Sequence, residues 1–263
     1  VIYPTFEEYP NRSDKSEIVP FISQKQDFLY NAEDIKLFYN DKGIKHLLVI
    51  NPDNPTGNFI ETKEILNLAK WCKKRSIHLI VDESFVDFSE NFENNSLLHD
   101  EILEEYPNVT VIKSISKSYG VPGLRLGILA TSDKKQIDNI KKDVSIWNIN
   151  SFGEYYMQIF GKYSKDYVIA CKAFIQERER FQDEMKRIKG IRVIPSQANY
   201  FMIEITGNTT SDDLSKILLQ KYNILIKSCN SKHGLENRNY IRIAVRSKEE
   251  NNILIAALKE IIG

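Results

Sequence analysis

The sequence predicts an α/β protein that has a large domain with a mostly parallel sheet and a smaller C-terminal α+β domain. Three observations lead to this prediction. Short apolar segments of strand length alternate with helical segments in the first part of the chain. Three of these apolar segments run directly into polar clusters. After Trp147 the pattern changes to a long charged helix and closely spaced strands. Continuous apolar strands are typical of a parallel sheet covered on both faces.

The large domain takes its strands from short runs of apolar and β-branched residues, expected at 46–50, 77–81, 109–112 and 126–130. A helix is expected between the first two strands, at 62–74, because its apolar residues recur at helical spacing, and Thr62 is its predicted N-cap. A further helix is expected to begin at Ser132 and Asp133 and to end near Val144.

The smaller domain begins with an amphipathic helix expected at 164–189. Strands are expected at 191–194, 199–205, 224–227 and 240–245, with helices at 211–221 and from 248 onward. The predicted domains are residues 1–160 and 161–263.

Composition narrows the possible functions. Lys plus Arg and Asp plus Glu are equal at 36 each, so no basic face for nucleic acid is expected. Three widely spaced cysteines without a CxxC pair favour a reduced, cytoplasmic setting. The histidines show no metal-ligand spacing, and no apolar run reaches membrane-spanning length. The chain opens on VIYPTFEEYP without a methionine, so we expect an N-terminal segment of the large domain to be missing.

Three polar clusters follow three of the expected strands: 51–57 (NPDNPTG), 82–84 (DES) and 114–117 (SISK). Ligands in open α/β sheets bind beyond the carboxyl ends of the strands, so these clusters predict one site. Each also has an ordinary explanation: a Pro/Gly turn, an acidic helix cap or surface acid at Asp82, and a solvated lysine at Lys117. Arg125 could equally pair with a surface carboxylate. The four features together, in this order, favour the site.

The order NPDNPTG, VDESF, SISKSYGVPGLRLG resembles the fold-type I pyridoxal 5'-phosphate (PLP) enzymes of the class I/II aminotransferase superfamily. The segments PTFEEY, GVPGLRLG and YIRIAVRS resemble the branch that contains histidinol-phosphate aminotransferase and threonine-phosphate decarboxylase. The resemblance covers nearly the whole chain. It implies the aspartate aminotransferase-like fold and PLP as cofactor.

The resemblance assigns the catalytic pair and the ring contacts. Lys117 would form the Schiff base with the cofactor aldehyde and later move a proton at the substrate Cα. Asp82 would pair with the pyridine nitrogen and keep it protonated. Asn54 would donate its amide to the phenolate oxygen. Phe6 would stack on the cofactor ring, although an ordinary core position is its alternative.

The resemblance also assigns the anion contacts. Ser114, Ser116 and Arg125 would hold the cofactor phosphate. Arg242 would bind the substrate α-carboxylate, the alternative being a surface arginine on an edge strand. It stands between Ile241 and Ile243, so a strand would place it on the face opposite two core residues.

Two positions depart from the family pattern. Phe85 stands where many relatives have a tyrosine that donates to the phenolate oxygen, so that donor is lost. Lys227 stands where relatives often have an arginine that helps bind a substrate phosphate, and lysine lacks the planar fork. The family's phosphate-capping nest and a tyrosine that reaches the partner subunit's site both come from further upstream. We therefore expect these residues alone to bind PLP weakly or not at all.

The expected function is amino-group transfer between an amino acid and a keto acid or a phosphorylated carbonyl substrate. The alternatives are a PLP-dependent decarboxylase of a phospho-amino acid and an inactive or regulatory domain of the same fold. The resemblance implies a homodimer. The order of the motifs also resembles fused proteins in which a nucleotidyltransferase domain precedes the aminotransferase-like domain. One expectation is therefore that this chain is a fragment of such a fusion.

Overall fold

The computed structural model describes residues 1–14, 17–236 and 238–263. Contacts divide the chain into two compact units. The first unit comprises Val1–Leu29, Asp53–Phe59 and Ala173–Gly263, and the second comprises Tyr30–Pro52 and Ile60–Lys172. Each unit is described by itself. Both units are built from separate segments of the chain. The predicted division after residue 160 stays a prediction.

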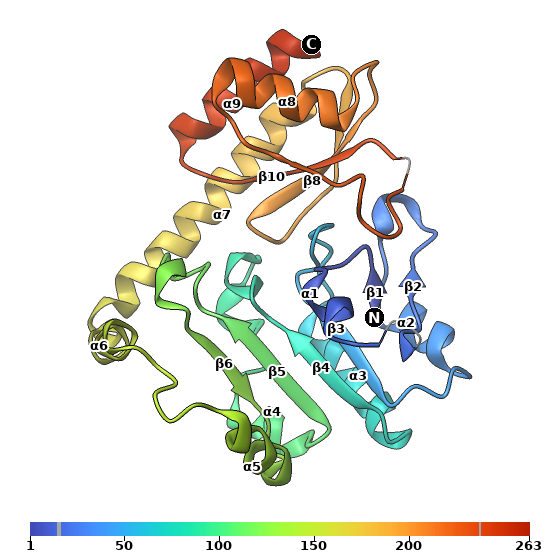
Figure 1. Ribbon diagram of the computed structural model, residues 1–263, viewed down its shortest axis with the longest axis vertical. Coiled ribbons are helices and arrows are strands. Elements are labelled where there is room, and N and C mark those ends of the chain that lie inside the picture. The colour runs from blue at the N-terminus through green and yellow to red at the C-terminus, as the bar shows by residue number, and fades with distance from the viewer. Residues whose placement is uncertain (15–16, 237) are drawn as a thin grey trace. The chain divides into compact units, whose positions relative to one another are not determined.

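The second unit contains a four-stranded sheet in the order β3-β4-β5-β6 (Figure 1). The strands β3 (His46–Ile50), β4 (His78–Asp82) and β5 (Val109–Ser114) are parallel, as predicted. The edge strand β6 (Gly127–Ala130) is antiparallel to β5. Parallel neighbours usually need a helical crossover, and the segment between β5 and β6 contains only turns and a short 3-10 helix.

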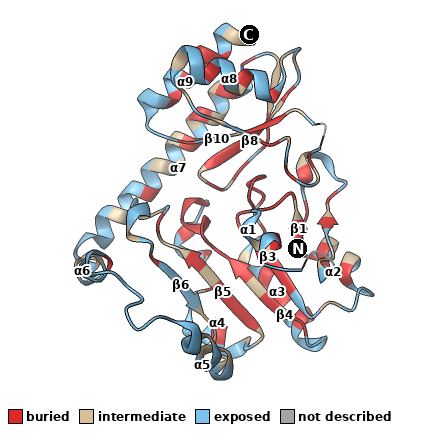
Figure 2. Ribbon diagram, in the orientation of Figure 1, coloured by how far each residue is buried: buried red, intermediate tan, exposed pale blue. Residues whose placement is uncertain are grey.

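The central strands are buried, whereas the edge strand β6 is partly exposed. In β3, β4 and β5 the residues Leu47, Leu79 and Val111 are fully buried, and Figure 2 shows the inner strands mostly as buried ribbon. In β6, Ile128 and Leu129 are 42% and 40% exposed. The expectation that the sheet is covered on both faces is therefore wrong at β6.

The helices of the second unit follow their apolar spacing and their caps. They are α2 (Ala32–Tyr39), α3 (Thr62–Lys74), α4 (Asp100–Glu105), α5 (Lys134–Asp143) and α6 (Ser151–Phe160). The carboxylate of Asp133 accepts from two backbone amides and caps α5, which begins close to the predicted start at Ser132 and Asp133. The predicted cap of α3 is wrong, because Glu61 occupies that position and the Thr62 hydroxyl donates instead to the Asn95 carbonyl. The long helix α7 (Ser164–Lys186) contributes residues to both units.

The first unit contains a second four-stranded sheet, in the order β7-β8-β10-β9. Its strands are β7 (Ile191–Val193), β8 (Tyr200–Ile205), β9 (Lys227–Ser228) and β10 (Tyr240–Ala244), and all neighbours are antiparallel. The helices α8 (Ser211–Tyr222) and α9 (Lys248–Ile261) and the later part of α7 pack on it through one apolar core. The strand predicted at 224–227 is shorter than expected, because Ile224 and Ile226 pack against that core without joining the ladder.

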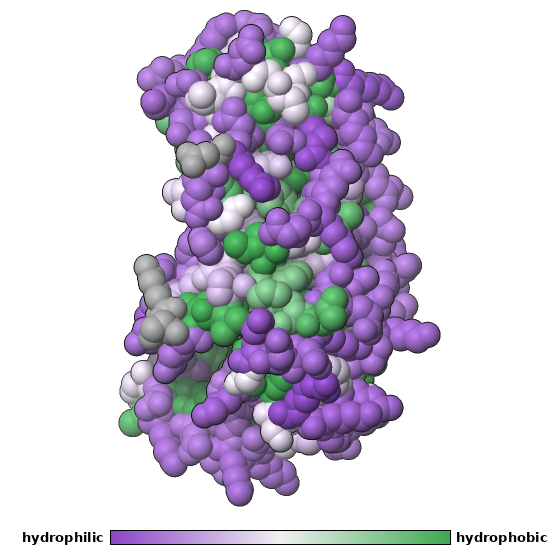
Figure 3. Space-filling view, turned by 90° about the vertical axis from the view of Figure 1, so that its right-hand side faces the viewer, coloured by the Kyte–Doolittle hydropathy of each residue, from purple (hydrophilic) through white to green (hydrophobic). Residues whose placement is uncertain are grey.

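The start of the chain also belongs to the first unit. The strands β1 (Ile2–Tyr3) and β2 (Phe21–Ile22) pair in parallel, and α1 (Glu8–Asn11) lies between them in the sequence. The molecular face drawn in Figure 3 is mostly hydrophilic, with hydrophobic side chains in smaller groups. Among the described helices, none has both the length and the apolar character that a membrane span requires.

Candidate active site

Lys117 lies on a tight turn that follows β5. The amide of Tyr119 donates to the Ile115 carbonyl at 3.2 Å, and the amide of Gly120 donates to the Lys117 carbonyl at 3.2 Å. The lysine side chain is exposed, and its amine lies 3.8 Å from the centroid of the Phe85 ring. We call residues 115–120 the lysine turn. It presents a primary amine at the carboxyl edge of the parallel strands.

Asp82 ends the neighbouring strand β4 and is buried, so it is neither a surface acid nor a helix cap. One of its oxygens accepts from the amide of Ser84 at 2.9 Å and from the Ser84 hydroxyl. That hydroxyl in turn accepts from the Ser114 amide at 3.0 Å, at the end of β5. Ser84 therefore ties the carboxylate to the strand that leads into the lysine turn. Sequence reasoning did not single out Ser84 for this contact.

The predicted phosphate contacts follow on the same segment. Ser114 is half-buried, and Ser116 is buried with its hydroxyl 3.4 Å from the Leu126 carbonyl. Arg125 is exposed and adopts the left-handed conformation at a φ of 58°. Such a conformation is costly for a side chain other than glycine and is frequent at functional sites. Within the described residues Arg125 forms no ion pair, so its explanation as a surface salt bridge receives no support.

A pocket of about 350 Å³ opens beside this segment in the second unit. It is lined by Arg125 and by residues on both sides of Lys117, together with apolar and aromatic side chains of β6 and α6. The residues are Ile115, Tyr119, Arg125, Leu126, Gly127, Ile128, Asn148, Ile149, Tyr156, Met157 and Phe160.

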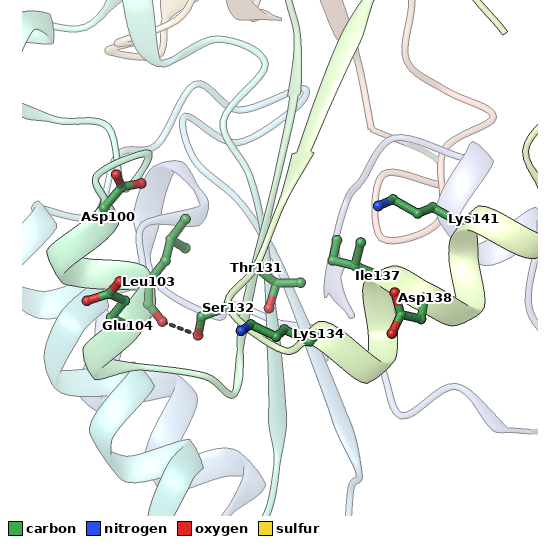
Figure 4. Close-up of a pocket in the computed structure, with 9 residues that line it drawn as sticks. All are labelled: Asp100, Leu103, Glu104, Thr131, Ser132, Lys134, Ile137, Asp138 and Lys141. Atoms are coloured by element: carbon green, nitrogen blue, oxygen red, sulfur yellow. Dashed lines mark hydrogen bonds between the residues drawn. The ribbon is translucent and has the colours of Figure 1, made fainter.

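A groove of about 730 Å³ lies elsewhere in the second unit, between α4 and α5. Figure 4 shows acidic side chains of α4 on one side and Lys134, Asp138 and Lys141 of α5 on the other. The Ser132 hydroxyl donates to the Leu103 carbonyl at its floor (Figure 4). None of the predicted site residues lines this groove.

In the first unit, Asn54 and Arg242 are in direct contact. The Arg242 guanidinium donates to the Asn54 side-chain oxygen at 2.7 Å and lies over the Tyr200 ring, 5.0 Å from its centroid. Arg242 is half-buried between Ile241 and Ile243, both fully buried, as the strand alternation predicted. Since the arginine occupies the amide oxygen, the amide nitrogen is the donor that Asn54 can offer, which fits its predicted role.

Lys227 is the cross-strand partner of Arg242. The two residues face each other in the antiparallel pair of β9 and β10, so their side chains leave the same face of the sheet. Like charges opposite each other destabilise a sheet unless something compensates them. An anion bound by both cations would compensate them.

Phe6 is 41% exposed, so the ordinary core position proposed as its alternative is wrong. Its two neighbours are fixed by one buried lysine. The amine of Lys232 donates to the Thr5 carbonyl at 2.8 Å and contacts the Glu7 carboxylate. These contacts hold the backbone on both sides of an exposed aromatic ring.

The NPDNPTG segment is a structured turn rather than a loose connection. Gly57 has a φ of 77°, and a Cβ there would lie 2.0 Å from the Ser196 hydroxyl, so only glycine fits. The Tyr200 hydroxyl donates to the Asp53 carbonyl at 2.7 Å. Burial raises the pKa of Asp53 to about 7, although the hydrogen bond from Thr56 lowers it. The segment is thus packed firmly enough to fix Asn54.

One cluster near the lysine turn was missed from the sequence. Lys113 and Asp87 form a buried ion pair at 2.6 Å, and the Ser118 hydroxyl donates to the other Asp87 oxygen at 2.7 Å. A signal was present, because Lys113 shares the buried face of β5 with Val109 and Val111. A charge at such a position requires a buried partner.

The structure therefore gathers the predicted residues in two sets. The second unit brings Asp82, Ser114, Ser116, Lys117 and Arg125 to the end of one sheet. The first unit joins Asn54, Arg242 and Lys227 and also carries Phe6. That both sets serve one cofactor stays a prediction.

The second unit places an exposed lysine, a buried carboxylate and an exposed arginine on the segments that follow the strands β4 and β5, an arrangement consistent with enzymes that bind a carbonyl-bearing, phosphorylated cofactor. Residues 3–258 match the family of aminotransferases of class I and II, and the chain belongs to that family. Its fold is that of the PLP-dependent aminotransferases, as predicted, and the family's cofactor is pyridoxal 5'-phosphate.

Individual relatives are similar over the whole chain. The L-serine phosphate decarboxylase of Sulfurospirillum multivorans is 33% identical over 267 residues, which cover all of this chain and 67% of that protein. The CMP-5'-(3-aminopropyl)phosphonate synthase of Streptomyces rubellomurinus is 31% identical over 99% of this chain and 41% of that protein. The solved structure of a decarboxylase from Sulfurospirillum multivorans matches with a TM-score of 0.90 and 32% identity, covering all of this chain and 75% of the other.

The residues present fit this cofactor. The Lys117 side chain is exposed, the Asp82 carboxylate is buried at the end of the neighbouring strand, and no carboxylate in the described part of the chain pairs with the Arg125 guanidinium. The amine, carboxylate and guanidinium of the second unit are therefore of the chemical types that PLP requires.

Proposed function

We propose that the chain is the PLP-binding part of a decarboxylase that acts on a phosphorylated amino acid. The observation that carries this proposal is the likeness to L-serine phosphate decarboxylase over the full length of the chain. The sequence had favoured amino-group transfer and kept decarboxylation as the alternative. The comparisons support the alternative better than the first choice.

The cation pair of the first unit supports a substrate with two anionic groups. Arg242 and Lys227 face each other across β9 and β10, and Arg242 is oriented by Asn54 and Tyr200. A phospho-amino acid carries a carboxylate and a phosphate. We propose that Arg242 binds the carboxylate through its planar fork and that Lys227 contributes its charge to the phosphate.

The second unit supplies the groups for the reaction. The cofactor contributes the electron sink that accepts the electron pair left when a Cα bond breaks. Asp82 is held by Ser84 at the end of β4, and we propose that its carboxylate would keep the pyridine nitrogen of the cofactor protonated. After CO2 leaves, Cα must take up a proton, and the Lys117 side chain in its ammonium form is the proposed donor, becoming a neutral amine. Ser114, Ser116 and Arg125 are proposed to hold the phosphate of the cofactor.

Amino-group transfer is the second candidate. The match of residues 3–258 to the aminotransferase family favours it. The two reactions use the same lysine and aspartate and differ in which Cα bond is broken. In decarboxylation the carboxylate leaves and the amine is retained, whereas in transfer the Cα proton leaves and a keto acid is formed.

The products decide between the two reactions. The chain is incubated with PLP and carboxyl-labelled O-phosphoserine or O-phosphothreonine, with Lys117→Ala as the control. Release of labelled CO2 with an amine product supports decarboxylation. Formation of a keto acid without CO2 would support transfer. Neither product in the wild-type chain, at full occupancy with PLP, would support the inactive or regulatory alternative. The chain spans 41% of the length of one relative and 67% of the other. The same assay is therefore also applied to a longer protein that contains this chain.

The setting of the enzyme is part of the proposal. We propose a homodimer in the cytoplasm that acts on a small molecule and binds neither nucleic acid nor membrane. The equal numbers of acidic and basic residues and the family resemblance support this. A fusion to an upstream nucleotidyltransferase domain stays a prediction.

A further inference from the structure

One buried carboxylate binds residues on both sides of Lys117 in the sequence. Asp87 lies in the 3-10 helix Val86–Phe88, which follows Asp82 and Phe85 in the chain. Its first oxygen is 2.6 Å from the Lys113 amine, in the strand that enters the turn. Its second oxygen accepts from the Ser118 hydroxyl at 2.7 Å, directly after Lys117. The carboxylate thus connects Lys113, two positions before the lysine turn, with Ser118, which follows the reactive lysine inside the turn.

A cluster of aromatic side chains in the second unit includes Tyr119, the residue after Ser118. The rings of Tyr119 and Tyr167 stack with their centroids 4.4 Å apart, and the Phe160 ring lies 4.7 Å from Tyr119. The Tyr167 hydroxyl is buried and lies near the Ser118 hydroxyl, but in the described part of the chain it makes no hydrogen bond of normal geometry. Burial first, and then the charge of Asp87, raise the pKa of Tyr167, so this phenol stays neutral. The Asp87 carboxylate therefore has an uncharged phenol near it.

Stability alone is a poor explanation for such an ion pair. The Lys113 and Asp87 side chains are 7% and 9% exposed, and removing two charges from water costs about as much as their attraction returns. Buried ion pairs can often be replaced by apolar residues without loss of stability. What an apolar pair cannot replace is the second bond, from the remaining carboxylate oxygen to Ser118. That bond acts on the turn rather than on the core.

We propose that Asp87 is a positioning residue that sets the orientation of the lysine turn, through Lys113 before the turn and Ser118 within it. The inference rests on the proposed function for the role of Lys117. It adds that the amine is aimed by a carboxylate that does not itself touch the cofactor or substrate. Loss of either bond to Asp87 is expected to change the orientation of the Lys117 amine.

The most conservative test is Ser118→Ala, which removes one hydroxyl and leaves the ion pair. Hydrogen exchange is measured at the amides of Tyr119 and Gly120, which are bonded within the turn. Loss of a hydrogen bond to a charged group predicts exchange faster by about tenfold or more. Ser118→Thr keeps the hydroxyl and is expected to restore the slow exchange. Ser132→Ala, which removes the hydroxyl bonded to Leu103 in the groove of Figure 4, is the matched control and is expected to leave both amides unchanged.

A second readout separates positioning from stability. The rate at which PLP becomes attached to Lys117 is followed by borohydride reduction and peptide mass spectrometry. Ser118→Ala is expected to slow attachment by about tenfold, Ser118→Thr to restore it, and Ser132→Ala to leave it unchanged. Asp87→Asn, which loses the charge that both donors use, is expected to have the same effect or a larger one.

The outcomes distinguish this inference from the proposed function. Unchanged exchange at Tyr119 and Gly120 in both Ser118→Ala and Asp87→Asn would overturn the positioning role. Faster exchange with unchanged attachment would also overturn it, because the contact would then serve only local stability. A wild-type chain that is not labelled at Lys117 would contradict the proposed function, and the exchange data would then decide alone whether Asp87 holds the turn.

Discussion

The amine of Lys117 lies 3.8 Å from the centroid of the Phe85 ring. The ring is buried and follows Asp82 by three positions, so one short segment after β4 supplies both the buried carboxylate and the surface on which the lysine rests. The face of an aromatic ring attracts an ammonium group by about 0.5–1 kcal/mol at exposed positions. Phe85 therefore has a role of its own beyond occupying the position of the family's tyrosine, because its ring face attracts the Lys117 ammonium group.

The first prediction concerns this ring. Phe85→Tyr places a hydroxyl donor where many relatives have one, and we expect it to tighten PLP binding by up to about tenfold. Binding is measured by titration of the chain with PLP and visible absorbance. Phe88→Tyr, which adds the same hydroxyl to another buried ring of the segment, serves as the control. Equal or weaker binding in Phe85→Tyr, with unchanged thermal stability, would show that no donor is missing at this position.

The second prediction concerns the buried ion pair. Lys113→Met leaves the Asp87 carboxylate buried without its cation and is expected to cost about 3–5 kcal/mol of unfolding free energy. The double variant Lys113→Met with Asp87→Leu is expected to recover most of that loss. Urea unfolding measures both. The exposed pair Lys172–Glu93 gives the comparison, since Lys172→Met is expected to cost no more than about 1 kcal/mol. A loss that is equally small in Lys113→Met would contradict the burial on which the positioning role depends.

The third prediction concerns pH. Burial raises the pKa of Glu83 to about 7, against hydrogen bonds from the Ser96 hydroxyl and the Leu97 amide. The folded chain therefore holds a proton that the unfolded chain releases near its ordinary pKa of 4.5. This contribution to stability is complete below pH 4.5 and is lost as the pH rises to about 7.

Glu83→Gln removes this proton and keeps the shape of the side chain. The unfolding free energy of the variant minus that of the wild type should increase from pH 5 to pH 8. The contribution of Asp53, whose pKa is also raised, is present in both proteins and cancels. A difference that does not change with pH would mean that Glu83 is ionised in the folded chain throughout this range.

The fourth prediction concerns Arg242. Arg242→Lys keeps the charge but loses the planar group that lies over Tyr200 and donates to Asn54. We expect the KM for a phosphorylated amino acid to rise by about tenfold to a hundredfold, with a smaller change in kcat. Arg246→Lys, at an exposed arginine that pairs with Glu250, is the control and should leave KM unchanged. An unchanged KM in Arg242→Lys would remove the carboxylate-binding role.

The sequence predicted those features that depend on local patterns. The strands β3, β4 and β5 were recognised from continuous apolar runs, and their parallel order places Asp82 and the lysine turn at one edge. Arg242 was recognised as a residue facing away from the core because Ile241 and Ile243 flank it. Lys113 could have been recognised in the same way, from its position on the face of Val109 and Val111.

Features that depend on pairing between distant segments could not be predicted. The contact of Arg242 with Tyr200 and the pairing of Arg242 with Lys227 follow from the register of β8, β10 and β9, which no local pattern encodes. The antiparallel direction of β6 follows from the absence of a crossover helix after the lysine turn. The first unit draws on three separate stretches of the chain, whereas apolar periodicity describes only continuous ones.

The most direct test of the account is the site of covalent attachment. Because these residues alone are expected to bind PLP weakly, the wild-type chain and Lys117→Ala are incubated with a large excess of PLP, then reduced with borohydride, digested and mapped by mass spectrometry. The account predicts one reduced cofactor adduct at Lys117 in the wild type and none in the variant. No adduct at Lys117, or an adduct distributed equally over exposed lysines in both proteins, would contradict the assignment of this residue and with it the proposed PLP chemistry.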